Sequence, residues 1–367
     1  MKILLIGEYS NVHATLAEGL RELGHEVTVM SNGDFWKNYP RDIDMARHEG
    51  RLGGIALLAK TYALLPRLCG YDVVQLINPM FLELKAERLF PVYRFLRSHN
   101  KRMILGAFGM DWYWVHTCTN EKPLRYSDFN IGNEVRQNAD ALKEQADWLG
   151  TAKERLNKLI AADCDGIVTG LYEYDVCYRP HFPEKTCYIP FPFKMPEQSY
   201  PSKSKDGKLK VFIGISKGRS EYKGTDIMLR AAEDVLAKHP DKMELVKAEG
   251  VPFAQYEVMM NGSDAILDQL YSYTPSMNSL LAMSKGIICI GGGEPENYEL
   301  LGEGKLRPII NVQPTYESVV TELEKLVLMP ETQIEELKRQ SREYVKRYHD
   351  YLKVAQQYTD FYTKTGH

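Results

Sequence analysis

The chain has 367 residues, of which 44% are hydrophobic and 26% charged, and its formal net charge is -3. This length exceeds one ordinary hydrophobic core and predicts two domains, and the composition is typical of a globular protein. Duplex-binding proteins usually carry a strong basic excess, so the charge argues against a nucleic-acid partner.

The six cysteines show no Cys-x-x-Cys spacing and no accompanying histidine cluster. We therefore expect no metal site and no disulfide framework, and reduced thiols in the cytoplasm fit best. The apolar run at residues 3–6 is too short for a secretory signal, and no stretch approaches the roughly 18 apolar residues of a membrane span. The expected location is cytoplasmic, with contact at the inner face of the membrane left open.

Continuous apolar segments alternate with helical ones in the first half of the chain. The expected strands are residues 2–7, 26–30, 71–77, 101–106, 166–169 and 186–189. Continuous rather than alternating apolar strands are typical of a parallel sheet covered by helices on both faces. A proline-rich, polar stretch then marks residues 191–207 as an interdomain linker.

The alternation restarts after the linker and ends in a helical tail from residue 331 to 363. The second set of expected strands is 209–215, 242–247, 265–267 and 287–290. We predict two doubly wound, Rossmann-like α/β domains. The first covers residues 1–190, the second 208–345, and residues 346–367 form a helix packing back on the first. Ligands of such sheets bind at the carboxyl ends of the strands, so the cleft between the domains is the default site.

The loop of residues 214–225 is the first candidate for a phosphate site, because it follows a strand and begins a helix. Gly214 permits close approach of an anion, and the helix N-terminus adds partial positive charge. Arg219 and Lys223 supply two cations. These features predict a cradle for a pyrophosphate, and a solvated basic loop is the alternative.

Two further loops of the second half have the same strand-to-helix position. In the first, Thr274 is the expected N-cap, so Ser276 and Ser279 lie in the first helical turn beside the free amides and predict a second anion site. In the second, three glycines at 291–293 precede Glu296 and Glu299, which could accept hydrogen bonds from sugar hydroxyls. The alternatives are an ordinary capped helix and a flexible turn.

These loops, in this order, resemble the donor-binding half of the family 4 retaining glycosyltransferases. Arg219 and Lys223 look like that family's pyrophosphate-binding pair. Gly250 and Val251 look like its base-holding loop, and Gln269 looks like part of its Asp-Gln strand end. The resemblance is fairly specific between residues 211 and 311 and looser over the whole chain.

The resemblance implies the two-domain GT-B fold and transfer of a sugar from a UDP- or GDP-sugar to a glycan or lipid-linked acceptor. The setting would be the synthesis of surface polysaccharide or glycoconjugate, without a metal or another cofactor. The family's two glutamates, with seven residues between them, correspond to Tyr273 and Leu281, and neither offers a carboxylate. Tyr273 is still expected to line the donor site. A non-catalytic nucleotide-sugar-binding partner and a GT-B-like epimerase therefore remain alternatives.

The loop after the first strand, residues 7–13, lacks the Gly-x-Gly-x-x-Gly fingerprint, which argues against a nicotinamide enzyme. Glu8, Asn11 and His13 are expected to project toward the cleft and bind the acceptor. The stretch from Gly106 to Asn133 is aromatic and polar, as an acceptor loop would be.

Three residues of that stretch are candidates for chemistry. Trp112 could stack on a sugar face, with core packing as the alternative. Asp111 or His116 could act as a base or stabilise a developing cation, together with Glu296, and the histidine could instead be structural.

Two Asp-x-Asp pairs, Asp42/Asp44 and Asp163/Asp165, are interpreted as structural rather than as manganese ligands. The apolar segment 53–69, which contains Lys60 and Arg67, could touch anionic lipid. A plain buried helix is the favoured interpretation.

Overall fold

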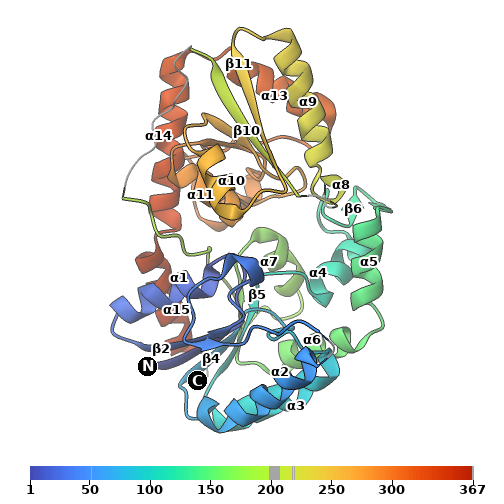
Figure 1. Ribbon diagram of the computed structural model, residues 1–367, viewed down its shortest axis with the longest axis vertical. Helices are drawn as coiled ribbons and strands as arrows, with labels where there is room; N and C mark the ends of the chain where they lie inside the picture. The colour runs from blue at the N-terminus through green and yellow to red at the C-terminus, as the bar shows by residue number, and fades with distance from the viewer. Residues whose placement is uncertain (51, 198–206, 217, 219, 366–367) are drawn as a thin grey trace. The chain divides into compact units, whose positions relative to one another are not determined.

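The computed structural model describes residues 1–50, 52–197, 207–216, 218 and 220–365, and Figure 1 shows the course of the chain. The chain divides into two compact units. The first consists of Met1–Pro123, Lys143–Pro192 and Tyr351–His367, and the second of Leu124–Leu142 and Phe193–Asp350.

The first unit is built on a seven-stranded, entirely parallel sheet with the order β3-β2-β1-β4-β5-β8-β9. Its strands are β1 (Lys2–Ile6), β2 (Glu26–Ser31), β3 (Ile43–Asp44), β4 (Val73–Leu76), β5 (Met103–Ala107), β8 (Gly166–Thr169) and β9 (Thr186–Tyr188). Every residue of β4, β5 and β8 is buried. This burial explains why their sequences are continuously apolar rather than alternating.

Helices and helical turns connect these strands. They are α1 (Val12–Glu22), η1 (Phe35–Lys37), α2 (Gly53–Leu64), η2 (Leu65–Leu68), α3 (Ala86–His99), α4 (Trp112–His116), the π-helical η3 (Thr117–Glu121), α6 (Ala152–Asp163), α7 (Tyr172–Tyr178) and α15 (Tyr351–Lys364). The last helix, α15, packs on α1, where Gly19 leaves room for the carbonyl of Tyr351. The Tyr362 hydroxyl donates to Gln75 on β4, so α15 is an integral part of the first unit.

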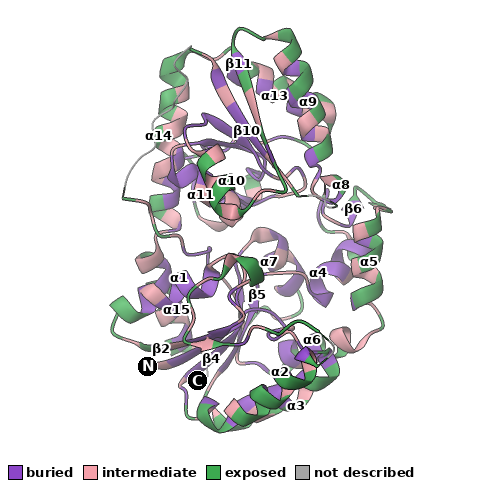
Figure 2. Ribbon diagram, viewed as in Figure 1, coloured by how far each residue is buried: buried purple, intermediate pink, exposed green. Residues whose placement is uncertain are grey.

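The second unit contains a four-stranded parallel sheet with the order β11-β10-β12-β13. The strands are β10 (Leu209–Ile215), β11 (Met243–Glu249), β12 (Ala265–Leu267) and β13 (Ile288–Ile290). The helices are α8 (Ser220–Lys223), α9 (Thr225–Lys238), α10 (Phe253–Met260), α11 (Met277–Ser284), α12 (Pro295–Leu300), α13 (Tyr316–Val327) and α14 (Glu331–Tyr348). Apolar side chains of β10, β12, β13, α9 and α13 form its core, whereas the edge strand β11 is partly exposed, as Figure 2 shows.

The segment Leu124–Leu142 belongs to the second unit although it lies in the first half of the sequence. It forms an antiparallel hairpin of β6 (Asn130–Ile131) and β7 (Glu134–Val135), followed by the start of α5 (Ala139–Trp148). The domain limits expected from the sequence placed this segment in the first domain. Its side-chain contacts to residues beyond 220 place it in the second, and no local pattern reveals such contacts.

One further expectation differs from the structure, and another is covered only in part by the described residues. The helical tail is not continuous, because α14 ends at Tyr348 and α15 begins at Tyr351, and the two helices belong to different units. Only part of the expected linker, residues 191–197 and 207, lies within the described residues.

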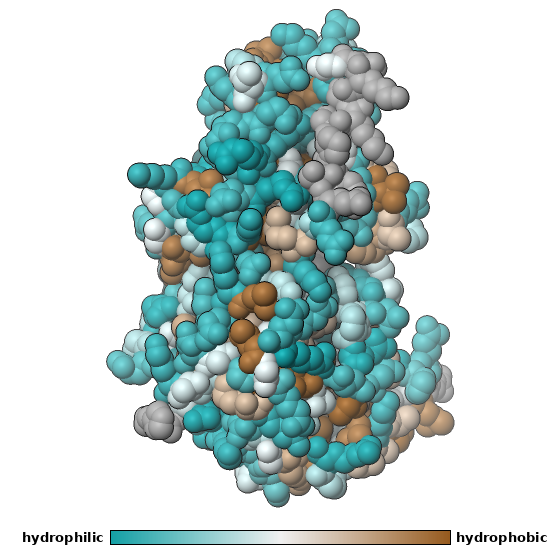
Figure 3. Space-filling view, turned by 90° about the vertical axis from the view of Figure 1, so that its left-hand side faces the viewer, coloured by the Kyte–Doolittle hydropathy of each residue, from teal (hydrophilic) through white to brown (hydrophobic). Residues whose placement is uncertain are grey.

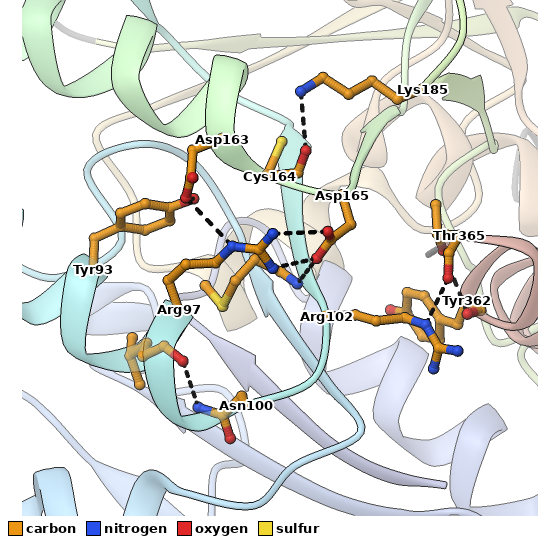
Figure 4. A network of polar contacts seen from close by, with 12 residues as sticks. Tyr93, Arg97, Asn100, Arg102, Asp163, Cys164, Asp165, Lys185, Tyr362 and Thr365 are labelled. Carbon is orange, nitrogen blue, oxygen red and sulfur yellow. Dashed lines mark hydrogen bonds and ion pairs between the residues drawn. The ribbon is translucent and has the colours of Figure 1, made fainter. Parts of the chain in front are cut away.

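Both Asp-x-Asp pairs hold the first unit together. Figure 4 shows the Arg97 guanidinium between Asp163 and Asp165, with two hydrogen bonds to Asp165 at 2.6 and 2.9 Å. In the other pair, Asp42 accepts from Arg21 at 2.6 Å and Asp44 accepts from Arg41 at 2.7 Å. These carboxylates already serve as partners of arginines, which agrees with their interpretation as structural groups.

Candidate functional site

The parallel strands of the second unit bring three of the predicted loops to one edge of the sheet. The order β11-β10-β12-β13 reverses direction between β10 and β12, which is where ligands of open α/β sheets bind. The loops after these two strands are joined there, because Leu270 N–H donates to the carbonyl of Lys223 at 3.1 Å. Gly224, with φ of 74°, is the N-cap of α9, so this 14-residue helix begins beside Lys223.

The predicted cation pair is described only in part. Arg219 lies outside the described residues, whereas Lys223 ends α8 and is half-buried. Gly214, the penultimate residue of β10, lies against the ring of Tyr256, which an added Cβ would meet at 2.5 Å. Packing on Tyr256 therefore accounts for this glycine without any ligand.

The start of α11 differs from the expectation in its cap. Ser276, not Thr274, is the N-cap residue, and its side chain makes no capping hydrogen bond. Ser279 is buried and donates its hydroxyl to Asp268, and Asn278 donates to the other oxygen of the same carboxylate at 2.7 Å. The first turn of α11 is thus tied to the end of β12, and the Ser279 hydroxyl is directed at a carboxylate.

Of the four other predicted donor residues, three lie just after strands of this sheet. Gly250, with φ of 63°, and Val251 directly follow β11, the former exposed and the latter half-buried. Gln269 is half-buried two residues after β12, and Glu299 is exposed on α12. The sheet therefore gathers residues from all the predicted donor loops that the structure describes.

A cluster of charged and aromatic side chains, which the sequence did not reveal, joins the inserted segment to the start of α12. The Arg125 guanidinium donates to Glu294 at 2.8 Å and to Glu296, and the Tyr126 hydroxyl donates to Glu294. Glu294 is 2% exposed. Burial raises the pKa of Glu296, but the hydrogen bond and the charge of Arg125, together with a backbone hydrogen bond, lower it by more, so the pKa lies below its usual value.

Tyr273, at the position of the first family glutamate, is part of this cluster. Its ring packs on the ring of Tyr126 at 4.7 Å, and the Arg125 guanidinium lies 5.1 Å from its centre. Burial raises the pKa of the Tyr273 hydroxyl to about 12, so it is neutral at physiological pH. The hydroxyl accepts a hydrogen bond from Tyr126 N–H at 3.3 Å. An uncharged phenol thus stands where a carboxylate is expected, and Leu281 on α11 offers no polar atom either.

A second contact fixes the inserted segment beside Lys223. Arg136 donates to the carbonyls of Glu221 and Tyr222 at 2.7 and 3.1 Å, and its guanidinium lies 3.9 Å from the centre of the Tyr271 ring. The segment therefore contacts both loops at the reversal point of the second sheet.

In the first unit, two of the expected acceptor residues are internal. Glu8 accepts from Ala14 N–H at 2.8 Å and from His13 N–H at 3.3 Å, at the start of α1. His13 is fully buried and hydrogen-bonds Gly7 and Gln75. Burial raises the pKa of Glu8 to about 8 and lowers that of His13 to about 3. Asn11 is the half-buried N-cap of α1, with φ of 70°.

The expected catalytic residues of the first unit lie on α4 and at its cap. Asp111 is fully buried, caps α4 through Trp114 N–H and accepts from the Tyr178 hydroxyl at 2.7 Å. Burial raises the pKa of Asp111 to about 7, because its two partners compensate only in part.

Trp112 is 7% exposed and stacked between two side chains. The His116 ring lies 4.3 Å from it, and the Lys158 ammonium lies 4.0 Å from its centre. Burial lowers the pKa of His116, whose side chain is 33% exposed. Of these three predicted residues, His116 offers the most accessible polar atoms.

A hollow of about 620 Å³ lies at the carboxyl edge of the first sheet. It is lined by Phe35 and Trp36 of η1, by residues 46–50 and by Glu83, which follow β2, β3 and β4. The sequence prediction did not include these residues, because the loops show no motif.

Within the described ranges, no three His, Cys, Asp or Glu side chains come together as a metal site would need. Over the same part of the chain, no helix combines the length and the apolar character required to cross a bilayer.

Comparison with known proteins gives a likeness in structure but not in sequence. No protein-family model matches the chain, and no curated protein matches it. Among solved structures, sucrose-phosphate synthase from Thermosynechococcus elongatus is 13% identical, with a TM-score of 0.64 over 99% of both chains.

Two further structures are similar over nearly the whole chain. The Anabaena protein HepE, solved with UDP and glucose, is 11% identical with a TM-score of 0.60, over 99% of this chain and 100% of its own. Starch synthase IV from Arabidopsis thaliana, bound to ADP and acarbose, is 10% identical with a TM-score of 0.60, over 99% of each chain. Together with its two Rossmann-like units, this likeness shows that the chain has the GT-B fold of glycosyltransferases.

Proposed function

We propose that the protein is a glycosyltransferase that moves a sugar from a UDP- or GDP-sugar to a glycan or lipid-linked acceptor. The observation that carries this proposal is the junction of two loops at the reversal point of the second sheet. There the carbonyl of Lys223 accepts from Leu270, beside the start of α9. Helix starts and lysine side chains are groups that bind diphosphates, and two of the three similar structures were solved with UDP or ADP.

In this proposal the nucleotide lies against Gly250 and Val251, and the diphosphate lies near Lys223, Arg219 and the first turn of α11. These groups stabilise the negative charge that grows on the diphosphate as the glycosidic bond breaks. Side chains and helix amides then do the work that a metal ion does in other transferases. The acceptor lies on the first unit, at the carboxyl edge of its sheet.

We further propose a cytoplasmic enzyme of polysaccharide or glycoconjugate synthesis that retains the anomeric configuration, as the resemblance to family 4 implies. His116 is the preferred general base, because Asp111 is fully enclosed by Trp114 and Tyr178.

A thermal-shift panel of UDP-glucose, UDP-N-acetylglucosamine, GDP-mannose and ADP-glucose tests donor binding. A donor at about 100 times its Kd stabilises the folded state by about 2.7 kcal/mol, which raises the melting temperature by several degrees. Lys223→Ala and Arg219→Ala should remove most of that shift. Lys325→Ala on α13 should keep it, because that side chain is 62% exposed and belongs to a surface ion pair. A panel with no shift, or equal shifts in all variants, contradicts the assignment.

Donor binding without transfer is the second candidate function, and Tyr273 is the observation that favours it. The neutral phenol of Tyr273, stacked under Arg125, stands at the position where the family 4 glycosyltransferases have a glutamate. Binding of a nucleotide-sugar without release of free nucleotide, across a panel of saccharide acceptors, would support this candidate. Release of nucleotide that depends on an acceptor would exclude it.

A further inference from the structure

Helix α2 presents an apolar stripe to solvent. With the N-cap residue Leu52, its exposed apolar residues follow the i, i+3, i+4, i+7 spacing of one helix face: Leu52, Ile55, Ala56, Ala59, Tyr62 and Ala63. Lys60 is exposed beside them. The opposite face, with Leu57, Thr61 and Leu65, is buried in the first unit. The helix is therefore largely apolar on both faces. Figure 2 shows that part of α2 is exposed. The interpretation of segment 53–69 as a plain buried helix is wrong for this face.

Two exposed aromatic residues of η1 lie near the same helix. Phe35 is 60% and Trp36 66% exposed, and Phe35 has φ of 58°, which is uncommon for an aromatic residue. Both line the hollow together with residues 46–50, and the carbonyl of His48 lies against the backbone of Gly53 on α2. One loop thus connects η1 to the start of α2.

We define the apolar face as Phe35, Trp36, Leu52, Ile55 and Tyr62. These five account for half of the ten large hydrophobic side chains that are exposed in the described part of the chain. Figure 3 shows another view, in which hydrophilic residues predominate and apolar ones form separate patches. A concentration of large apolar side chains on one surface is typical of an interaction site.

The charge of this region differs from that of the whole chain. Residues 35–68 contain six Lys or Arg and three Asp or Glu, a net charge of +3, whereas the whole chain has -3. No acidic residue occurs from 50 to 68. Lys60 on α2 and Arg67 on η2 are both exposed. Glu49 and Glu83 line the hollow beside Phe35 and Trp36. The charged residues from 50 to 68 are all basic, however, and this part of the apolar face complements an anionic lipid surface.

We propose that the apolar face binds the surface of a bilayer containing anionic phospholipids, with α2 lying in the interfacial plane. Leu52 and Ile55 enter the acyl boundary. Trp36 and Tyr62 lie at the headgroup level, where amphipathic rings are most stable. This inference goes beyond the proposed glycosyl transfer, and it would place a lipid-linked acceptor close to the first unit.

Vesicle binding by the full chain tests the inference. The wild type should sediment with vesicles of phosphatidylcholine and phosphatidylglycerol, far less with phosphatidylcholine alone, and less at about 0.5 M than at about 0.05 M salt. Trp36 reports the contact directly, because the other three tryptophans, Trp112, Trp114 and Trp148, are at most 7% exposed. Its emission should shift to the blue and be quenched by brominated lipids.

Matched variants test whether binding to vesicles occurs through this face or by non-specific adsorption of the protein. Leu52→Glu with Ile55→Glu should weaken vesicle binding by at least about tenfold, because charges replace the inserted side chains. Both positions are exposed, so the fold should be kept, as circular dichroism and the melting temperature would check. Val258→Glu changes a side chain that is 70% exposed on the second unit, and it should leave binding unchanged.

Three results would overturn the proposal. The wild type fails to bind anionic vesicles at low salt, the Val258 variant loses as much binding as the double variant, or light scattering finds a dimer that the double variant dissociates. The last result would assign the face to a second copy of the chain. The vesicle assay reads neither donor binding nor turnover, so its failure is distinct from failure of the proposed function.

Discussion

Tyr126 donates its hydroxyl hydrogen bond to Glu294, a residue 168 positions further along the chain. The same carboxylate accepts from Arg125 at 2.8 Å and from Gln313 at 2.9 Å. Glu294 therefore joins the inserted segment to the start of α12, and the donor-side loops of the second unit depend on a part of the chain that the sequence places elsewhere.

Glu294→Gln should destabilise the second unit. An amide cannot accept all three hydrogen bonds, and it leaves a buried donor unsatisfied at a cost of about 1–3 kcal/mol. We expect the melting temperature to fall by several degrees. Glu299→Gln, at an exposed position of the same helix, should change it little. Equal melting temperatures for the two variants would contradict the role of Glu294.

Stability should depend on pH through Glu8. Because its pKa is raised from 4.5 to about 8, the folded protein keeps a proton that the unfolded chain releases. The stabilising contribution is complete below pH 4.5 and is lost as the pH rises through 8, at roughly 1.4 kcal/mol per pH unit within that window.

The difference in unfolding free energy between wild type and Glu8→Gln, from urea titrations at several pH values, isolates this effect. The difference should decline across the window and level off above it. His13 contributes in the opposite direction, because its pKa is lowered from 6.5 to about 3, but it is present in both proteins and cancels. Parallel curves for the two proteins would show that Glu8 does not titrate in this way.

Gly19→Ala should destabilise the first unit. Alanine is a better helix former than glycine by about 1 kcal/mol. However, the added Cβ would lie 2.6 Å from the carbonyl oxygen of Tyr351 and 2.8 Å from the Cβ of Ala355. We expect α15 to be displaced at a cost of about 1–3 kcal/mol, seen as a lower melting temperature. Gly304→Ala, where no atom lies within 4 Å, is the control. A more stable Gly19 variant would exclude the close contact of α1 and α15.

Asp165→Ala should destabilise the first unit without affecting any response to manganese. The variant removes both hydrogen bonds to Arg97 and the one from Met103 N–H at 2.7 Å. Hydrogen bonds to charged groups contribute about 1.5–3 kcal/mol each when buried, and this site is only partly buried, so we expect a total of about 2 kcal/mol. Asp241→Ala, at an exposed position, is the control. A melting temperature of the wild type that rises with manganese and no longer does so in the Asp165 variant would indicate a metal site instead.

The sheets could be predicted from sequence because their strands are continuously apolar. The segment 101–106 corresponds to β5 at Met103–Ala107, and the segment 209–215 to β10 at Leu209–Ile215. A strand that is buried on both faces can be recognised in the sequence as a continuous run of apolar residues. The short β3 leaves none, because two residues carry no period.

The contacts within the candidate site were harder to predict from the sequence than the strands. Loops at strand ends could be located by their glycines, but the contacts of Arg125 with Glu294 and Glu296 join residues about 170 positions apart. For α2, the sequence allowed contact with lipid but favoured a buried helix, for another reason. When both faces of a helix are apolar, periodicity does not tell which one faces the core.

The order of segments has a consequence for how the protein is made. The first unit begins at Met1 and still needs α15, whose Val354, Ala355, Tyr358 and Tyr362 are buried. On the ribosome, all of Phe193–Asp350 is synthesised before that helix emerges. The surface of α1 around Gly19 therefore stays uncovered until the second unit has been translated, because only then can α15 pack on it. This nascent polypeptide is a natural client for chaperones that shield apolar surfaces during synthesis.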